Sequence, residues 1–415
     1  MKKEPVSRDF TLLWSGKAIS DAGSAVTQFA LPLVGVIYLH ASPLQAGLLT
    51  SCSSVASALL AIPAGAALDA MKKRPVMVAS DLARMVLLGS LPLAQALGQL
   101  TLVQLYVVAV LCGLFTMLFN VSSQAHLPAL ISSDQLLRAN SQLGSTSWIA
   151  NIGGPMFGGV LVAALGAARA ILLDVGSFLA SVVTVCLLKT PEPETERRKA
   201  RNFRNEISAG ISFLLKHRQL RRLTLSNAFT SWSLMFLTPL EVIFLIRELG
   251  ATAEQWGLIN GLACVGGLVG VSCIGWLSRY MGTGQRLWWF GLSRGWGMAI
   301  VVFAQRGLVG LAAACIGWFI LLFSASIYNT TQQTLRQQIC PANMRARVHT
   351  AVLSLTGAGK VLAPLLGGIA AETFGLRAAL AIGTFFLCVA PLVLDRSEQE
   401  SGTRLTAEAP AATAN

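Results

Sequence analysis

The stretch QAGLLTSCSSVASALLAIPAGAALDAMKKR, residues 45–74, decides the fold class of this chain. Its first 24 residues carry no charged side chain, and Asp69 and the basic residues 72–74 come directly after them. A helix rises ~1.5 Å per residue, so the uncharged run is long enough to cross the ~30 Å hydrocarbon core of a bilayer. The stretch therefore predicts a membrane-spanning helix that ends at a basic loop.

Eleven further runs along the chain have a similar length and a similar lack of charge. The twelve spans are expected at residues 11–39, 44–69, 75–97, 101–123, 137–165, 169–189, 221–247, 253–279, 287–305, 308–330, 348–372 and 376–394. The whole chain is 54% hydrophobic and 12% charged, whereas a soluble domain carries about 25% charged residues. We therefore predict an all-α polytopic membrane protein with twelve transmembrane helices.

The basic residues indicate which side of the membrane each loop faces. With both termini in the cytoplasm, 24 Lys and Arg residues lie on the inner side and four lie on the outer side. This split follows the positive-inside rule and favours cytoplasmic termini. The net charge of +13 is then explained by orientation in the membrane, and no nucleic-acid partner is expected.

The two halves of the chain repeat one another at a nearly constant offset. The matching positions are Gln45 and Gln255, Gly65 and Gly275, Arg84 and Arg294, Asn120 and Asn329, Arg138 and Arg347, and Pro155 and Pro364. The offset is 210 residues for the first three pairs and 209 for the others. Such a repeat predicts two six-helix bundles related by a pseudo-two-fold axis along the membrane normal, with a substrate site between them.

A long polar and basic stretch separates the halves. The expected divisions are a bundle at 1–189, a cytoplasmic linker with an amphipathic helix at 190–220, a second bundle at 221–395 and a disordered tail at 396–415. The linker helix is predicted because Ile207, Ile211, Leu214 and Leu215 recur at helical spacing beside basic residues, as in helices that lie on a membrane surface.

The loop after the second span resembles a signature of the major facilitator superfamily, in which a Gly is followed by an acid four residues on and then by a basic pair. Gly65, Asp69 and the pair 73–74 fit, whereas Ala70 and Lys72 depart from the pattern. The resemblance covers residues 8–395 and implies a cytoplasmic gate; simple positive-inside anchoring is the alternative. The expected gate residues are Gly65, Asp69, Lys73, Arg74, Asp81, Arg84, Arg138 and Arg347.

The fifth span resembles a motif of the exporters in this superfamily. Its small residues recur every four positions, which permits tight helix contact, and generic packing is the alternative explanation. The motif residues are Gly154, Pro155, Gly158 and Gly159, with a weaker copy at Pro364, Gly367 and Gly368.

The stretches 19–24, 81–84 and 136–140 resemble the subgroup that includes the enterobactin exporter and macrolide efflux proteins. This resemblance implies proton-driven export of drugs or siderophores across a bacterial inner membrane.

Charged residues inside spans are costly in lipid and are functional candidates. Asp21 and Lys360 each lie near the middle of a span, and we expect Asp21 to respond to protons or cations. The alternative for Asp21 is an ion pair with Lys17, four residues before it. Ala109 stands where many proton antiporters of the family have Arg, so coupling must use other residues. The other expected cavity residues are Gln28, Asn151, Glu241, Trp148 and Trp232.

These observations predict a secondary active transporter that exports small amphipathic compounds by alternating access. An uptake permease of the same fold and a non-transporting membrane sensor are the alternatives. The chain has no G-x-x-x-x-G-K-[ST] motif of an ATP-driven pump, and no arrangement of catalytic or metal-binding residues was found, so neither an enzyme nor a cofactor is expected. The expected partners are a small-molecule substrate, protons and the lipid bilayer, and the protein is expected to be monomeric.

The gate interpretation makes a specific prediction for Asp69. An acid at the end of an apolar helix needs a partner, so Asp69→Asn should lower transport while the protein still inserts into the membrane. Transport in liposomes and the amount of protein in isolated membranes measure the two effects. Wild-type transport by the variant would leave only the anchoring interpretation.

Overall fold

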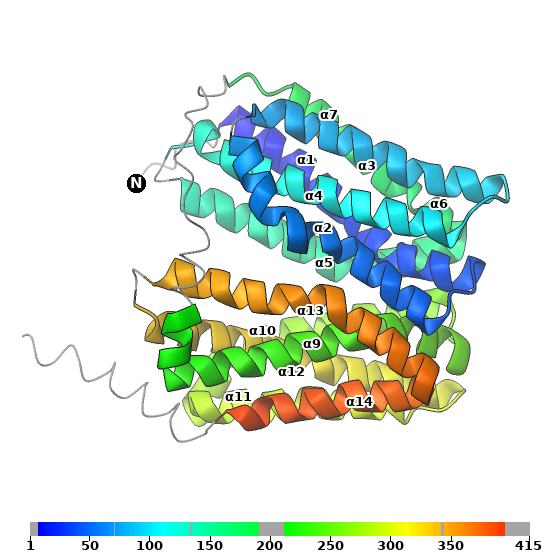
Figure 1. Ribbon diagram of the computed structural model, residues 1–415, viewed down its shortest axis with the longest axis vertical. Helices are drawn as coiled ribbons and strands as arrows, with labels where there is room; N and C mark the ends of the chain where they lie inside the picture. The colour runs from blue at the N-terminus through cyan, green and yellow to red at the C-terminus, as the bar shows by residue number, and fades with distance from the viewer. Residues whose placement is uncertain (1–6, 70, 133–134, 191–210, 342–343, 395–415) are drawn as a thin grey trace, which may run out of the picture. The chain divides into compact units, whose positions relative to one another are not determined.

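The computed structural model describes residues 7–69, 71–132, 135–190, 211–341 and 344–394, and these ranges contain helices and no strand. The chain forms two compact units, residues 1–201 with 252–258 and residues 202–251 with 259–415. Figure 1 shows the helices coloured along the chain.

Of the expected linker, residues 211–216 are helical and Leu214 packs with Leu220 and Val348. The rest of the linker helix and the tail at 396–415 lie outside the described residues.

The first six spans form helices close to the predicted positions. The elements are α1 (Arg8–Leu33) with a π-helical turn at Val34–Tyr38, α2 (Pro43–Asp69), α3 (Lys73–Ala96), α4 (Leu102–Leu130), α5 (Leu136–Leu165), the short α6 (Ala167–Ala170) and α7 (Leu172–Cys186). Together α6 and α7 make up the sixth span.

The second half repeats this order. Its elements are α9 (Arg218–Ile243) with a π-helical turn at Phe244–Glu248, α10 (Ala253–Tyr280), α11 (Thr283–Val302), α12 (Leu308–Ile339), α13 (Arg345–Phe374), α14 (Leu376–Val389) and a 3-10 turn at Ala390–Val393. Eight of the described helical segments are long and apolar enough to cross a membrane. The other four are α1, α2, α11 and α13, each at least 20 residues long.

The internal repeat is visible in the ends of the helices. Helix α1 and its π-helical turn span 8–38, and α9 and its π-helical turn span 218–248, so both boundaries match at an offset of 210. At an offset of 209, α5 ends before Gly166 (φ 84°) and α13 ends before Gly375 (φ 89°). Both glycines adopt a left-handed conformation that side chains disfavour. The predicted repeat is therefore confirmed at the level of individual turns.

The start of the second helix in each half uses the same capping contacts. The Ser42 N–H donates to Gln45 Oε1 (2.8 Å), and the Gln45 N–H donates to Ser42 Oγ (3.3 Å). Thr252 and Gln255 make the same two contacts at 2.9 and 3.2 Å. These reciprocal contacts are a capping box, which satisfies backbone donors at a helix N-terminus. The repeated Gln found in the sequence therefore has a structural role in both halves.

Helix α1 packs between α5 and α7. Glycines allow a close approach at both helix contacts, because they carry no side chain there. A Cβ added at Gly154 would lie 2.3 Å from Ala25 Cβ, and one at Gly158 would lie 3.1 Å from the Phe29 ring. On the other side, a Cβ at Gly23 would lie 2.3 Å from Ser177 Oγ. In the second half, Gly367 approaches the Phe236 carbonyl in the same way. The small residues of the exporter-like motif therefore bring α5 against α1.

This close approach predicts a difference between two glycines of α5. Gly154→Ala should lower the free energy of unfolding by about 1–3 kcal/mol, because the helices must separate to admit the methyl group. Gly144→Ala should be neutral or slightly stabilising, because nothing lies within 4 Å of a Cβ at that position. Thermal unfolding in detergent compares the two variants. Equal midpoints for both would contradict the packing described here.

Candidate functional site

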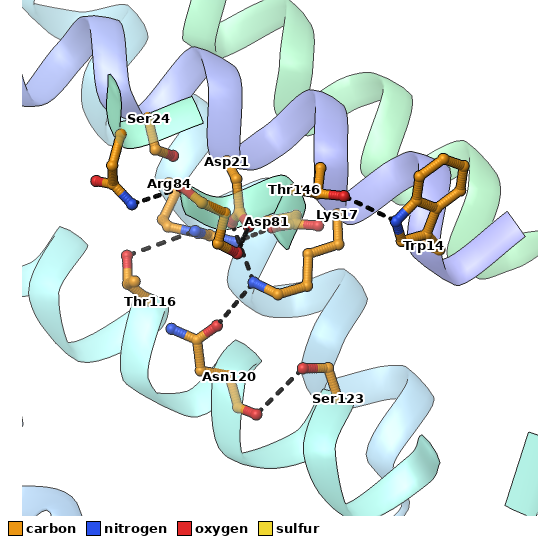
Figure 2. A network of polar contacts seen from close by, with 12 residues as sticks. Trp14, Lys17, Asp21, Ser24, Asp81, Arg84, Thr116, Asn120, Ser123 and Thr146 are labelled. Carbon is orange, nitrogen blue, oxygen red and sulfur yellow. Dashed lines mark hydrogen bonds and ion pairs between the residues drawn. The ribbon is translucent and has the colours of Figure 1, made fainter. Parts of the chain in front are cut away.

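A polar network inside the first unit joins α1 to α4 and α5 (Figure 2). Lys17 Nζ lies 3.0 Å from Asp21 Oδ1 and donates to Asn120 Oδ1 at 3.2 Å. The second oxygen of Asp21 accepts a hydrogen bond from Ser147 Oγ. The Lys17 and Asp21 side chains are 17% and 23% exposed. The i,i+4 ion pair expected as the alternative for Asp21 therefore forms, and it is partly accessible.

A further contact joins α5 to α1. Trp14 Nε1 donates to Thr146 Oγ1 at 2.9 Å, as Figure 2 shows. Within α5, Asn151 Nδ2 donates to the Ser147 carbonyl at 2.8 Å. A change at the Asp21 carboxylate would therefore act directly on the contact between α1 and α5.

A second ion pair lies deeper in the same unit. Asp81 and Arg84 bind each other, and their side chains are 0% and 5% exposed. The Arg84 guanidinium lies over the rings of Phe119 (5.0 Å) and Phe178 (4.3 Å). Such faces attract a cation. Lys17 also interacts electrostatically with Asp81, which connects this pair to the first network.

A third carboxyl group, Asp174 on α7, has a different environment. Its side chain is buried and accepts hydrogen bonds from Ser24 Oγ at 3.2 Å and Ser177 Oγ at 2.9 Å. No ion pair of Asp174 is found in the described part of the chain, although Arg84 acts on it electrostatically. The sequence predicted only a structural role for Asp174, because the residue lies near a helix end.

Together these groups leave one carboxyl group in excess. The described charged side chains of the network and of the Asp174 site beside it are Lys17, Asp21, Asp81, Arg84 and Asp174, the last in the first turn of α7. Three acids of this set thus face two bases. A buried charge without a counter-charge is costly in lipid, and a proton on one carboxyl group would remove that cost.

The described contacts include only some of the expected gate residues. Lys73 Nζ donates to the Leu68 and Met71 carbonyls at the end of α2, and Arg74 Nη2 donates to the Cys186 (3.3 Å) and Leu188 carbonyls at the end of α7. Cations are favourable at helix C-termini. The side chains of Gly65, Asp69 and Arg347 are outside the described set, and Arg138 is exposed.

The predicted cavity residues of the second unit differ in their exposure to solvent. Trp232 Nε1 donates to the Leu355 carbonyl at 3.3 Å, and a Cβ at Gly359 would meet the Trp232 ring. Lys360 is exposed, and Glu241 is buried at 6% exposure. In the first unit Gln28 is exposed, and the Trp148 side chain is outside the described set.

Three residues of the network were not predicted from the sequence as site residues. Asn120 was noted only for its repeat partner Asn329, and Thr146 and Ser147 carried no signal. Hydroxyl groups are common in membrane helices, where they often bond to the carbonyl four residues before. Their roles here become visible only when α1 and α5 are placed together.

The buried pair on α3 predicts a large coupling energy. In a double-mutant cycle with Asp81→Asn and Arg84→Met, each single change should destabilise the protein by about 3–5 kcal/mol, because it leaves an uncompensated buried charge. The double variant should recover about 2 kcal/mol or more of this loss. The control cycle uses the Glu248–Arg377 pair, which is 32–44% exposed. There the coupling should stay below ~1 kcal/mol. Equal coupling in both cycles, measured by thermal unfolding, would contradict this description.

Comparison of the sequence with known proteins shows the family to which the chain belongs. The Major Facilitator Superfamily model matches residues 13–355. The multidrug efflux pump Tap of Mycolicibacterium fortuitum is 26% identical over 390 residues, which cover 90% of this chain and 93% of that protein. The MFS-type transporter YfiS of Bacillus subtilis (strain 168) is 24% identical over 400 residues, covering 92% and 90%.

Solved structures support the same fold. An inward-facing bacterial homologue of the iron transporter ferroportin has a TM-score of 0.73 at 18% identity, covering 95% of this chain and 99% of that one. The nucleoside transporter NupG has a TM-score of 0.74 at 11% identity, covering 94% and 99%. At these identities the likeness shows the fold alone. The chain belongs to the major facilitator superfamily and is a multi-pass membrane transporter.

Proposed function

We propose that this transporter exports small amphipathic compounds in exchange for protons across a bacterial plasma membrane, with both termini in the cytoplasm. The observation that carries the proposal is a set of charged side chains in the first unit in which three acids, Asp21, Asp81 and Asp174, lie with two bases, Lys17 and Arg84. A proton bound by this set neutralises the excess charge. Its release creates a net negative charge that favours a different arrangement of the helices.

Asp21 is the carboxyl group best placed to exchange that proton. Its side chain is partly exposed, whereas Asp81 and Asp174 are buried. The ionised Asp21 carboxylate accepts from Lys17 and Ser147. Protonation weakens the ion pair, and Lys17 keeps Asn120 as an acceptor. The proton therefore changes the contact between α1 and α5, the two helices that Gly154 and Gly158 bring together.

Export is favoured over uptake by two observations. The fifth span carries Gly154, Pro155, Gly158 and Gly159 at the spacing that resembles the exporter motif. A relative at 26% identity across nearly the whole chain is a multidrug efflux pump. In this proposal the sparse polar side chains Gln28, Asn151 and Trp232 contribute to an amphipathic substrate site.

The proposed contribution of the second unit is a basic side chain. Lys360 is exposed on α13 and would attract an anionic group of the substrate. The gate residues around Asp69 would close the inner side once in each cycle. The protein is proposed to work as a monomer, because each half contributes one of the two bundles that alternating access requires.

Transport by purified protein in liposomes tests the proposal. With an acidic lumen, wild-type protein should carry a dye, a macrolide or a catecholate siderophore into the lumen as protons leave. Asp21→Asn should abolish the part of this flux that depends on the pH gradient, since an amide cannot exchange a proton at neutral pH. Glu248→Gln is the control, because Glu248 lies in an exposed pair with Arg377, and it should leave the flux unchanged.

Two outcomes would overturn the proposal. Flux of Asp21→Asn that still follows the pH gradient would exclude Asp21 as the coupling residue. Ligand binding without any flux, by protein that unfolds at the wild-type temperature, would favour the sensor interpretation instead.

A further inference from the structure

The two halves differ at one pair of corresponding arginines. Arg84 of α3 matches Arg294 of α11 at an offset of 210, and their aromatic neighbours Phe119 and Tyr328 match at 209. Arg84 has Asp81 as its ion-pair partner. The residue that corresponds to Asp81 in the second half is Gly291. The repeat therefore preserves the cation and its aromatic face and removes the acid.

Arg294 is enclosed by aromatic and hydroxyl groups of α9 and α12. Its guanidinium carbon lies 3.9 Å from the centroid of the Tyr328 ring, and Nη2 donates to Thr230 Oγ1 at 3.3 Å. The Tyr328 hydroxyl lies 2.7 Å from Ser226 Oγ. Arg294, Tyr328 and Ser226 are 0% exposed, and Thr230 is 4% exposed. The cluster is therefore sealed from both solvent and lipid.

Two donors of this guanidinium are unused. Arg294 Nε and Nη1 are buried and make no hydrogen bond in the described part of the chain. A guanidinium does not give up its proton in proteins, so the positive charge remains at every physiological pH. A cation–π contact stabilises a cation by less than the penalty for burying an unpaired ion. The contacts found around Arg294 therefore do not balance its charge.

None of the acids of the same unit that the structure describes lies close enough to balance it. The described acids there are Glu241, Glu248 and Glu372. Glu241 is eleven residues after Thr230 on the same helix, about 16 Å along its axis. Glu248 pairs with Arg377, whose Nη1 donates to the carbonyl of Val302 at the end of α11. Glu372 lies next to that end too, two residues before α13 finishes. All three acids are thus near one end of the unit, and Arg294 lies midway along α11.

We propose that the cluster of Arg294, Thr230, Ser226 and Tyr328 binds a small monovalent anion such as chloride. The anion would accept from one of the unused donors, Nε or Nη1, together with the neighbouring Nη2, because each of the two shares an edge of the guanidinium with Nη2. It would supply the negative charge that Asp81 supplies in the first half. The site takes a small anion because its members are sealed from the surface, so a substrate has no access to them. It would hold the anion as a structural counter-ion of the second unit. This assignment does not depend on the proposed direction or coupling of transport.

Thr230 offers a way to replace the bound anion by a side chain. Its hydroxyl already lies beside Arg294 Nη2, and Asp is similar in size to Thr. In Thr230→Asp the new carboxylate should pair with Arg294 and make an external anion unnecessary. Thr230→Asn has nearly the same shape without the charge and serves as the matched control. Gly291→Asp is a poorer choice, because a Cβ at this position would lie 2.5 Å from Pro391 Cβ.

The test is thermal unfolding of the full-length protein in detergent, with chloride replaced stepwise by gluconate at constant ionic strength. Chloride and bromide should raise the midpoint of the wild type and of Thr230→Asn by about 2 °C per tenfold increase once the site begins to fill. Gluconate, a large anion, should have no such effect. Thr230→Asp should unfold at the same temperature in chloride and in gluconate.

Direct binding of radiolabelled chloride gives an independent readout at equilibrium. Wild-type protein should bind one chloride per chain that bromide displaces and gluconate does not, and Thr230→Asp should lose this binding. A wild-type protein without halide-dependent stability and without bound chloride would overturn the proposal. So would a Thr230→Asp variant that folds and keeps the full chloride effect, because the anion would then bind elsewhere.

Discussion

The need to compensate charge inside the membrane shapes this protein more than any other interaction. A charged side chain in a membrane helix is tolerated only when a counter-charge or several polar groups surround it. In the first unit this requirement brings α1, α3, α4, α5 and α7 together around two ion pairs and one carboxyl group held by hydroxyls. In the described part of the second unit it leaves Arg294 with an aromatic face and no ion-pair partner. The two halves share one architecture but meet the requirement differently.

Glycine residues let the helices approach closely enough for the charged and polar side chains to contact one another. Short groups such as the Asp174 carboxylate and the Ser177 hydroxyl reach α1 because Gly23 removes the side chain that would separate the helices. The absence of a side chain at Gly154 likewise lets α5 approach α1 closely enough for Ser147 to donate a hydrogen bond to Asp21. Tight helix packing and the polar network are therefore two parts of one structural solution. A change in protonation at the network acts on helices that have little room to adjust separately.

Much of the fold could be predicted from the sequence, and less of the site. The twelve spans and the repeat follow from hydrophobic length and from a constant offset, which are properties of the chain alone. The Lys17–Asp21 pair could also be anticipated, because residues four apart share a helix face. The roles of Asn120, Thr146 and Ser147 could not, since they depend on how each helix is rotated about its axis. For the same reason the sequence alone could not show which groups surround Arg294. It does show that Gly291 occupies the position that corresponds to Asp81, the ion-pair partner of Arg84.

The account depends on one claim, that Asp21, Asp81 and Asp174 form a set with one carboxyl group more than Lys17 and Arg84 can balance, and that this set binds a proton. Infrared spectroscopy of the purified protein during a pH titration tests it directly, because a protonated carboxylic acid has a carbonyl band distinct from that of a carboxylate. We expect such a band in the wild type at neutral pH, lost as the pH rises and absent after one aspartate of the set is replaced by asparagine. A spectrum with no protonated carboxyl group from these helices at any pH at which the protein transports would contradict the claim.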